Sequence, residues 1–409
     1  FVGYVDFLRR VDHPSGLGNF SYEVVDTKLA RSPKAKFIIQ LCLYSDLLSV
    51  DQGFLPQNIH VVLGDRTEQS YRLADYYRYY RSVKARFLER VKGGLAPTYP
   101  EPCAHCDLCH WRNLCQEQWT EDDHLCQVAN ITKIQIDKLR SGGITTLAGL
   151  AQLKLDDHVP GMQDATFQRL RRQAALQLER RETGKDLFEL LETDPAETKG
   201  FRRLPQPDPG DLFFDMEGDP LEEGGLEYLF GVYYHDDGQP KFQPFWAHSR
   251  QEERQAFQDF MAFVMDRLAR YPNMHIYHYA PYEETALKRL MSLHGTCEAE
   301  VDHLLRSEKL VDLYKVVRES LLASEPRYSI KNLETFYMEK RTGEVTNAGA
   351  SIVFYEHWKE TRDPALLQQI HDYNEDDCRS TYLLREWLLG IRPTDLPWFN
   401  ADTEETAEQ

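Results

Sequence analysis

Residues 212–217, with the sequence LFFDME, form an apolar stretch that carries two acids two positions apart. Side chains alternate along a β-strand, so Asp215 and Glu217 project from the same face. The flanking Phe213 and Phe214 predict that this strand is buried. Two carboxylates on one face of a buried strand are costly unless a cation lies between them. The stretch therefore predicts a core strand with a cation site.

Two later segments supply further acids. A short strand followed by a helix is predicted over residues 275–290, and this helix carries Glu283 in its first turn. A long helix is predicted from about residue 364 to 389, and Tyr373 and Asp377 lie four positions apart on one of its faces. Asp312 is another candidate acid, for which a structural role is an equal alternative.

These segments resemble the motifs of the RNase H-like, DnaQ-type 3′–5′ exonucleases, in the subgroup whose last motif is Tyr-x-x-x-Asp. Asp215-Met216-Glu217 corresponds to the first motif, and Tyr282-Glu283 corresponds to the second. The third motif is matched by residues 373–377, with the sequence YNEDD. The family usually has Asp in the second motif, so Glu283 is a departure from its pattern.

The resemblance implies phosphodiester cleavage assisted by Mg²⁺ or Mn²⁺, because hard divalent cations prefer carboxylate oxygens. Tyr373 would orient the attacking water through its hydroxyl group. The implied metal ligands are Asp215, Glu217, Glu283 and Asp377.

The N-terminal part has a second set of polar residues in an apolar setting. Asp26 and Lys28 end an apolar strand and share a face, and Asp6 lies at the start of an upstream strand. Gln40 and Tyr44 lie one turn apart on a predicted helix. Taken alone, Asp26 and Lys28 could equally form a surface ion pair.

The order Gly-x-x-Asp, Asp-x-Lys and Gln-x-x-x-Tyr resembles the RecB-type nuclease core of the P-D-(D/E)-x-K superfamily. The resemblance implies that Asp6 and Asp26 hold a metal ion and that Lys28 stabilises developing negative charge. Gln40 and Tyr44 would support the site or the DNA.

Four of the eight cysteines are bunched directly after this core, namely Cys103, Cys106, Cys109 and Cys115. Such spacing indicates a metal site more than a disulfide framework. The Cys-x2-Cys-x5-Cys pattern resembles the staple of RecB-type nucleases, which implies a [4Fe–4S] cluster with an N-terminal fourth ligand. That ligand would precede Phe1, or Cys103 could replace it. Zn²⁺ is the alternative, in which His105 and His110 could take part.

The stretch between the two predicted nuclease regions is helical in pattern. Gly142-Gly143 separates two short amphipathic pieces, which is typical of a helix-hairpin-helix and equally of a small helical spacer. The arginine-rich residues 168–181 could contact a nucleic-acid backbone or form a solvated helix face.

The overall composition of the chain excludes some classes of protein. A net charge of −18 over 409 residues argues against a basic nucleic-acid coating protein, but it is compatible with a nuclease that gathers carboxylates at metal sites. The sequence contains no run of eighteen apolar residues, no signal-peptide pattern and no P-loop motif, so we expect neither membrane insertion nor ATP hydrolysis. Because the chain starts with Phe1, we expect that a natural N-terminal segment precedes it.

The sequence thus predicts an α/β protein with five parts. These are a truncated restriction-endonuclease-like core (1–100), a cysteine-rich metal staple (101–128), a helical connector (129–204), an RNase H-like mixed-sheet domain (205–400) and an acidic tail (401–409).

The predicted function is that of a metal-dependent nuclease that acts on nucleic acid, on DNA rather than RNA. The whole-chain order resembles a bacterial group of RecB-like nucleases, which implies a cytoplasmic protein. Some of that group continue into a helicase, so we expect a helicase as partner or as a fused domain outside this chain. The alternatives are a nuclease with one active site, or a nucleic-acid binding or interaction module with one or both sites inactive.

Overall fold

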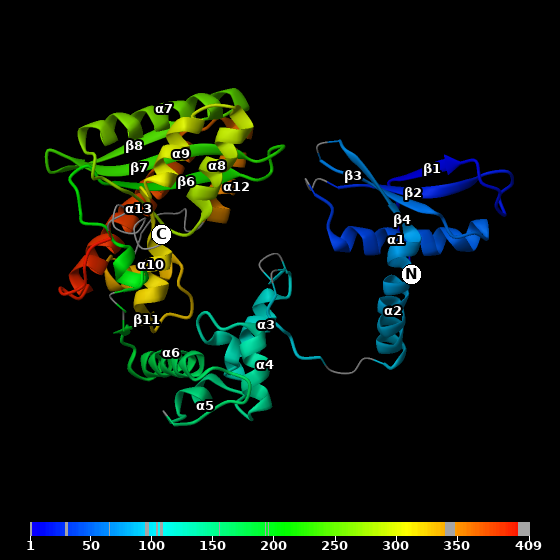
Figure 1. The fold of residues 1–409 in the computed structure, drawn as a ribbon, viewed down its shortest axis with the longest axis horizontal. Helices are drawn as coiled ribbons and strands as arrows, with labels where there is room; N and C mark the ends of the chain where they lie inside the picture. The colour runs from blue at the N-terminus through cyan, green and yellow to red at the C-terminus, as the bar shows by residue number, and fades with distance from the viewer. Residues whose placement is uncertain are drawn as a thin grey trace. The chain divides into compact units, whose positions relative to one another are not determined.

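The structure, a computed structural model, describes residues 2–28, 32–64, 66–94, 98–103, 105–106, 109–154, 156–192, 194, 196–339 and 348–399. The predicted acidic tail at 401–409 lies outside the described residues. The chain divides into two compact units, residues 1–101 and 102–409 (Figure 1). Both units combine helices with mixed sheets, so the predicted α/β class is confirmed.

The first unit is a four-stranded sheet with two helices. Its elements are β1 (Phe7–Val11), β2 (Ser21–Thr27), α1 (Ala35–Gln52), β3 (Asn58–Val62), β4 (Glu68–Arg72) and α2 (Leu73–Lys92). The strand order is β1-β2-β3-β4, with β2 and β3 parallel and the outer pairs antiparallel. A parallel pair needs a crossover, and α1 supplies it. Leu41 of α1 packs in one core with Val24 of β2 and Ile59 of β3.

The second unit starts with short helices. They are α3 (Arg112–Glu121), η2 (Leu125–Gln127), α4 (Lys133–Ser141), α5 (Leu147–Ala151) and α6 (Asp164–Thr183), followed by β5 (Phe188–Leu190) and η3 (Gly200–Arg203). Thr132 begins α4 with a capping box, in which Gln135 bonds back to it. Gly143 has a φ of 83°, which favours glycine, so the chain can turn sharply between α4 and α5.

The arginines of α6 bond within the protein. Arg169 donates to the backbone oxygen of Arg318, and Arg171 donates to that of Leu153. The remaining three form ion pairs: Arg172 with Glu189, Arg180 with Asp186 and Glu325, and Arg181 with Asp123. These bonds fix α6 within the unit, so they favour a structural role over the predicted nucleic-acid contact.

The C-terminal domain is built on a five-stranded sheet with the order β10-β9-β6-β7-β8. Its strands are β6 (Leu212–Asp219), β7 (Leu226–Asp236), β8 (Gln239–Trp246), β9 (Ile276–His278) and β10 (Leu310–Asp312), and β11 (Leu321–Ala323) pairs separately with β5. Its helices are α7 (Arg250–Arg270), α8 (Tyr282–His294), α9 (Glu298–Arg306), α10 (Leu313–Ser320), α11 (Ile330–Leu333), η4 (Glu334–Phe336), α12 (Ala348–Thr361) and α13 (Pro364–Ile391).

The central strand β6 is buried on both faces. Phe214 and Met216 pack against Phe257 and Phe260 of α7. Phe213 points to the opposite face, where it shares a core with Leu384 of α13. Figure 1 shows these two helices on opposite sides of the strands. Since a register slip of one residue would exchange the faces, this packing holds the acids of β6 on the α13 side.

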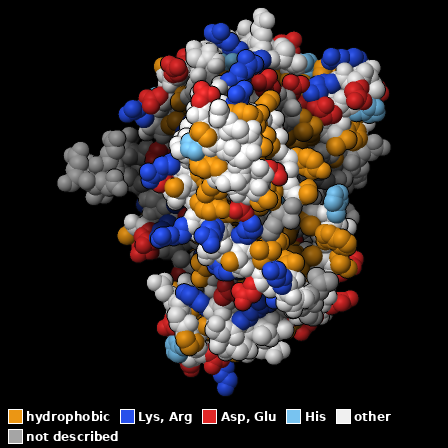
Figure 2. Space-filling model, turned by 90° about the vertical axis from the view of Figure 1, so that its right-hand side faces the viewer, with side chains coloured by type: hydrophobic (Ala, Val, Ile, Leu, Met, Phe, Trp, Pro, Cys, Tyr) orange, Lys and Arg blue, Asp and Glu red, His pale blue; other side chains and the backbone are white. Residues whose placement is uncertain are grey.

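The surface of the protein is mixed in character. On the face drawn in Figure 2, acidic and basic side chains are interspersed among hydrophobic ones. Among the described residues, no helix combines the length and the apolar character that crossing a membrane requires.

Candidate metal site

Three of the predicted acids meet where β6 faces α13. Asp215 and Glu217 come from β6, and Asp377 comes from the middle of α13. Each offers a carboxylate oxygen, and these oxygens all lie within 4.8 Å of one another. Glu217 is 5% exposed and Asp377 is 9% exposed, so the group sits largely away from solvent. The oxygen ligands and their spacing fit a hard divalent cation.

Burial and mutual repulsion disturb the ionisation of these acids. Burial raises the pKa of Asp215 well above its usual value, and the charges of Asp377, Glu217 and Glu283 raise it further. Burial, followed by the charge of Asp377, raises the pKa of Glu217 to about 8. Carboxylates in such a setting gain from a cation that neutralises them, which is typical of functional sites.

A glycine lets α13 approach the sheet closely enough to complete this group. A Cβ atom on Gly231 of β7 would lie 1.7 Å from Oδ1 of Asn374, so any side chain there would push the helix away. Because α13 lies so close to the sheet, Asn374 donates from Nδ2 to Oδ2 of Asp215 at 2.7 Å. Cys378 likewise donates from Sγ to the Gly231 backbone oxygen at 3.2 Å. Asn374 and Cys378 therefore fix the position of Asp377 relative to Asp215.

Glu283 lies close to the group but belongs to a second pair. It stands in the first turn of α8, is 3% exposed and raises the pKa of Asp215 by its charge. Its Oε2 lies 3.4 Å from Nδ1 of His278, which in turn contacts the Ala280 oxygen at 2.8 Å. Burial lowers the pKa of His278, but the Glu283 and Asp312 carboxylates and the Ala280 backbone together raise it above its usual value. The structure thus places Glu283 near Asp215 and pairs it with His278.

Tyr373 lies one turn before Asp377 on α13 and is buried. The Lys331 ammonium donates to its hydroxyl oxygen and lies 4.2 Å from the centre of its ring. Burial raises the pKa of Tyr373, and the Asp377 charge raises it further. The phenol is therefore neutral and its proton is available for hydrogen bonding.

Asp312 has the structural role that was one of its two predicted alternatives. Its Oδ1 accepts from the backbone nitrogens of Tyr314 and Ala280, both at 2.9 Å. The first bond caps α10, and the second holds Ala280, whose φ of 70° is unusual for a residue with a side chain. Asp312 thus supports the turn that leads into α8 and positions Glu283.

A cavity of about 570 Å³ opens beside the acids. Asp215, Glu217 and Glu283 line one part of it, and Tyr282 and Arg289 of α8 line another. Arg289 forms an ion pair with the buried Glu227, which also accepts from the Tyr282 hydroxyl at 3.0 Å. The cavity gives a ligand access to the carboxylates.

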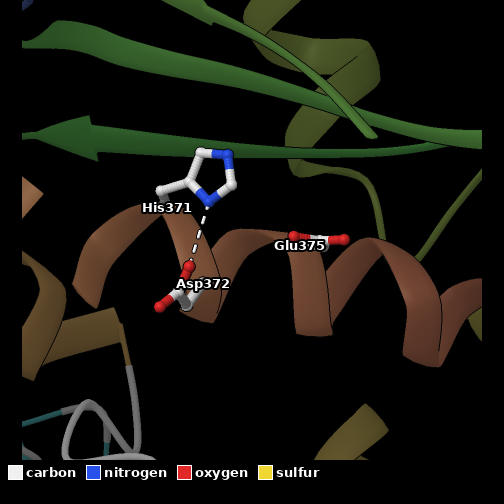
Figure 3. A group of neighbouring side chains, drawn as sticks. All are labelled: His371, Asp372 and Glu375. Atoms are coloured by element: carbon white, nitrogen blue, oxygen red, sulfur yellow. Dashed lines mark hydrogen bonds and ion pairs between the residues drawn. The ribbon is translucent and has the colours of Figure 1, made fainter. Parts of the chain in front are cut away.

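A second group of possible ligands stands on α13, with different surroundings. Figure 3 shows His371, Asp372 and Glu375 on neighbouring turns of the helix. Asp372 is exposed, and its Oδ1 already accepts from Gln368 at 2.7 Å and contacts His371 at 3.1 Å. We interpret these residues as a solvated helix surface.

The structure also brings the first N-terminal residues together. Lys28 forms an ion pair with the buried Asp26. Asp6 accepts from the Thr27 backbone nitrogen at 2.7 Å and from its hydroxyl at 2.5 Å, and these bonds lower the pKa of Asp6. Burial raises the pKa of Asp26, while Lys28 opposes that rise.

The two helical residues of this set bond to each other. Gln40 donates from Nε2 to the Tyr44 hydroxyl at 2.6 Å. A Cβ atom on Gly3 would lie 2.4 Å from the Tyr44 ring, so this ring packs closely against the segment that carries Asp6.

The cysteines lie in a series of tight turns. Cys106 donates its backbone nitrogen to the Cys103 oxygen at 3.0 Å, and Cys109 donates to the Cys106 oxygen at 3.2 Å. The Sγ atoms of Cys103 and Cys106 are 3.9 Å apart, while Cys115 lies within α3. Among the described residues, the close groups of possible metal ligands are the two acidic ones, and the four cysteines do not form a third.

Several residues that neighbour the acids were not predicted from the sequence. They are Lys331, Ser351 and His278, together with Asn374, which lies inside the predicted third motif. Ser351 and Asn374 both hydrogen-bond to Glu217 and favour its charged form. Of these, only Asn374 and His278 could have been found from the sequence, because each lies inside or next to a recognised motif.

Comparison with known families agrees with this geometry. Residues 212–389 match the family model RNase_H_2, described as the RNase_H superfamily. The search of curated proteins and the search of solved structures found no match. The matched region begins with β6 and ends in α13, so it contains every acid of the site. The predicted RNase H-like domain is thereby confirmed, and its class is that of nucleic-acid-processing nucleases, which generally use Mg²⁺ or Mn²⁺.

Proposed function

We propose that the C-terminal domain is a 3′–5′ exonuclease that removes nucleotides from DNA with Mg²⁺ or Mn²⁺. One observation carries the proposal: Asp215, Glu217 and Asp377 converge from two elements onto one buried point. Burial raises the pKa of Asp215 and Glu217, which makes a divalent cation the natural counter-charge. The resemblance to the DnaQ-type enzymes supports the 3′–5′ direction.

The residues have distinct tasks in this proposal. When bound, the metal ions supply an activated water and stabilise the leaving 3′ oxygen. The carboxylates of Asp215, Glu217, Glu283 and Asp377 would hold the ions. Asn374 holds the Asp215 carboxylate through its 2.7 Å bond, and the Tyr373 hydroxyl would orient the water. Glu283 would act beside His278, whose Nδ1 lies 3.4 Å from its carboxylate.

The substrate and partners follow from the resemblance and the domain order. DNA is favoured over RNA because the N-terminal unit resembles RecB-type nucleases. A helicase, as a partner or as a fused domain outside this chain, follows from the resemblance to RecB-like nucleases that continue into one.

End-labelled oligonucleotides test the direction of cleavage. We expect Mn²⁺-dependent release of nucleotides from the 3′ end, blocked by a phosphorothioate linkage at the 3′ end but not by one at the 5′ end. Asp377→Asn should abolish this release, whereas Asp372→Asn on the exposed surface of the same helix should retain it. Equal activity of both variants would contradict the proposal.

We also propose a second, RecB-like nuclease site in the first unit. The observation that favours it is the contact between Asp26 and Lys28, with Asp6 bonded to Thr27 between them in sequence. Asp6 and Asp26 would hold a metal ion, and Lys28 would stabilise negative charge in the transition state. Gln40 and Tyr44, joined by their 2.6 Å bond, would support the site.

The third proposal is a [4Fe–4S] cluster on Cys103, Cys106, Cys109 and Cys115, with Zn²⁺ as the alternative. The cluster rests on the resemblance of the Cys-x2-Cys-x5-Cys spacing to that of RecB-type nucleases. The 3.9 Å between the Sγ atoms of Cys103 and Cys106 supports the Zn²⁺ alternative, because two thiolates that share one tetrahedral ion at ~2.3 Å lie about 3.8 Å apart. Anaerobic purification followed by iron, sulfide and zinc analysis decides between the two. Stoichiometric zinc without iron would contradict the cluster.

A further inference from the structure

We propose that Lys331 is a positioning residue of the acidic site, which directs the Tyr373 hydroxyl toward Asp377 and tempers the negative charge offered to the metal ions. The inference rests on the proposed exonuclease function and assigns a role to a residue outside the recognised motifs. Lys331 lies on α11, between the sheet and α13 in sequence, and its ammonium reaches the Tyr373 hydroxyl.

The short helix α11 is well anchored, so the ammonium has a defined position. Ser329 caps the helix by accepting from the Asn332 nitrogen at 3.3 Å. Leu333 is fully buried in the core that also holds Phe213 and Leu384. The Lys331 ammonium lies 4.2 Å from the centre of the Tyr373 ring, a distance that also suits a cation–π contact.

The direction of the phenol proton follows from the chemistry of the two groups. An ammonium has three donors and no acceptor, so the Tyr373 oxygen must accept the bond from Lys331. The single phenol proton must then point elsewhere. Asp377, one turn further along α13, is the hydrogen-bonding carboxylate at that hydroxyl. The hydrogen bond from Lys331 therefore makes the Tyr373 hydroxyl donate its proton toward Asp377.

The positive charge also acts on the metal-binding acids. The Lys331 ammonium contacts the Tyr373 hydroxyl, one turn of α13 before Asp377, so its charge lies beside the metal-binding acids. A fixed positive charge at this place repels a divalent ion held by the acids, and removing the charge removes that repulsion. Loss of Lys331 should therefore tighten metal binding and slow turnover, and a simple loss of structure would not produce these opposite changes.

The experiment replaces Lys331 by Met and by Arg in the full chain, with Lys315→Met as the matched control. Lys315 is a half-exposed lysine of the same domain, 3.8 Å from Asp312. In Lys331→Met we expect Mn²⁺ to bind about tenfold more tightly, measured by calorimetry without substrate, and kcat for 3′ trimming to fall by up to about tenfold. Lys331→Arg should recover part of kcat, because a guanidinium also donates and carries charge.

A double-mutant cycle with Tyr373→Phe tests the proposed route. If Lys331 acts through Tyr373, Lys331→Met should change kcat little in the Tyr373→Phe background. Fully additive losses, or weaker Mn²⁺ binding in Lys331→Met, would overturn the inference. If the wild-type protein trims no 3′ ends, the proposed function fails, and the Mn²⁺ affinities alone then decide whether Lys331 tempers the charge of the site.

Discussion

The two acidic sites of this protein differ in how their charge is balanced. In the first unit, Asp26 has Lys28 as a direct counter-ion, and Asp6 is satisfied by two bonds from Thr27. In the C-terminal domain, Asp215, Glu217 and Asp377 crowd together, and the Lys331 ammonium reaches them through Tyr373. The first site is nearly neutral by itself, whereas the second requires a cation from outside. We infer that the second site depends more strongly than the first on a metal ion to offset its charge.

The largest effect is expected from removing the charge at the centre of the C-terminal site. Asp215→Asn keeps the size of the side chain but removes a ligand charge, so 3′ trimming should fall by about a thousandfold or more. The rate of nucleotide release from a 3′-labelled strand measures this. Wild-type trimming by a folded Asp215→Asn protein would show that the domain is a structural scaffold.

The next prediction tests whether the site of the first unit, in which Lys28 pairs with Asp26, cleaves nucleic acid. Circular single-stranded DNA has no ends, so only an endonuclease can cut it. Lys28→Ala should reduce its Mn²⁺-dependent cleavage by roughly a hundredfold or more, because a charge that stabilises the transition state is lost. Lys36→Ala, at an exposed position of α1, is the matched control. Unchanged cleavage by Lys28→Ala would mean that the first unit is inert or that another site cuts.

A smaller effect is expected at the hydroxyl beside the C-terminal acids. Tyr373→Phe keeps the buried ring but loses the hydrogen bond, and a metal-bound water can still form without it. We expect kcat for 3′ trimming to fall about tenfold, with little change in KM. A loss as large as that of Asp215→Asn would assign Tyr373 a more direct part in the reaction.

The smallest effect concerns stability and contrasts Glu217, whose pKa is raised, with Asp6, whose pKa is lowered. Glu217 has a folded pKa of about 8 against a usual 4.5, so its stabilising contribution is full below pH 4.5 and is lost as the pH rises to about 8. Asp6 has a lowered pKa and contributes stability above its usual value of 3.8.

The rise in Tm that Mn²⁺ produces at two pH values tests the raised pKa of Glu217. Because Mn²⁺ binds the ionised acids, it should raise Tm by roughly a few degrees more at pH 8 than at pH 6. Scanning calorimetry with and without Mn²⁺ measures the difference, which Glu217→Gln should remove and Asp26→Asn should leave in place. A Tm gain that is equal at both pH values would contradict the raised pKa.

Local patterns predicted the elements of the C-terminal site well. The apolar stretch at 212–217 is part of β6, and the long helix predicted to start near residue 364 is α13. The spacing of two on a strand and of four on a helix placed the side chains of Asp215, Glu217 and Asp377 on the faces that meet. These periodicities are local properties of the backbone, which a single sequence contains.

The arginine-rich helix shows where such patterns mislead. A run of arginines predicts either a solvated face or a nucleic-acid contact, yet Arg169, Arg180 and Arg181 of α6 bond to partners that are distant in sequence. Glu283 is similar, because the motif suggested a metal ligand and the structure adds its contact with His278. In both cases the folded structure, rather than the motif, shows which partner the side chain has.

By itself, the sequence determined the α/β class and the acids that meet in the C-terminal domain, because strand and helix periodicity fix which side chains share a face. The RNase H-like domain was predicted from the resemblance of its three motifs to a known family. The tertiary structure decided what surrounds those acids. Gly231 admits α13, Asn374 holds Asp215, and Lys331 reaches Tyr373. These contacts join residues far apart in the chain and depend on how closely elements pack, which no local pattern records.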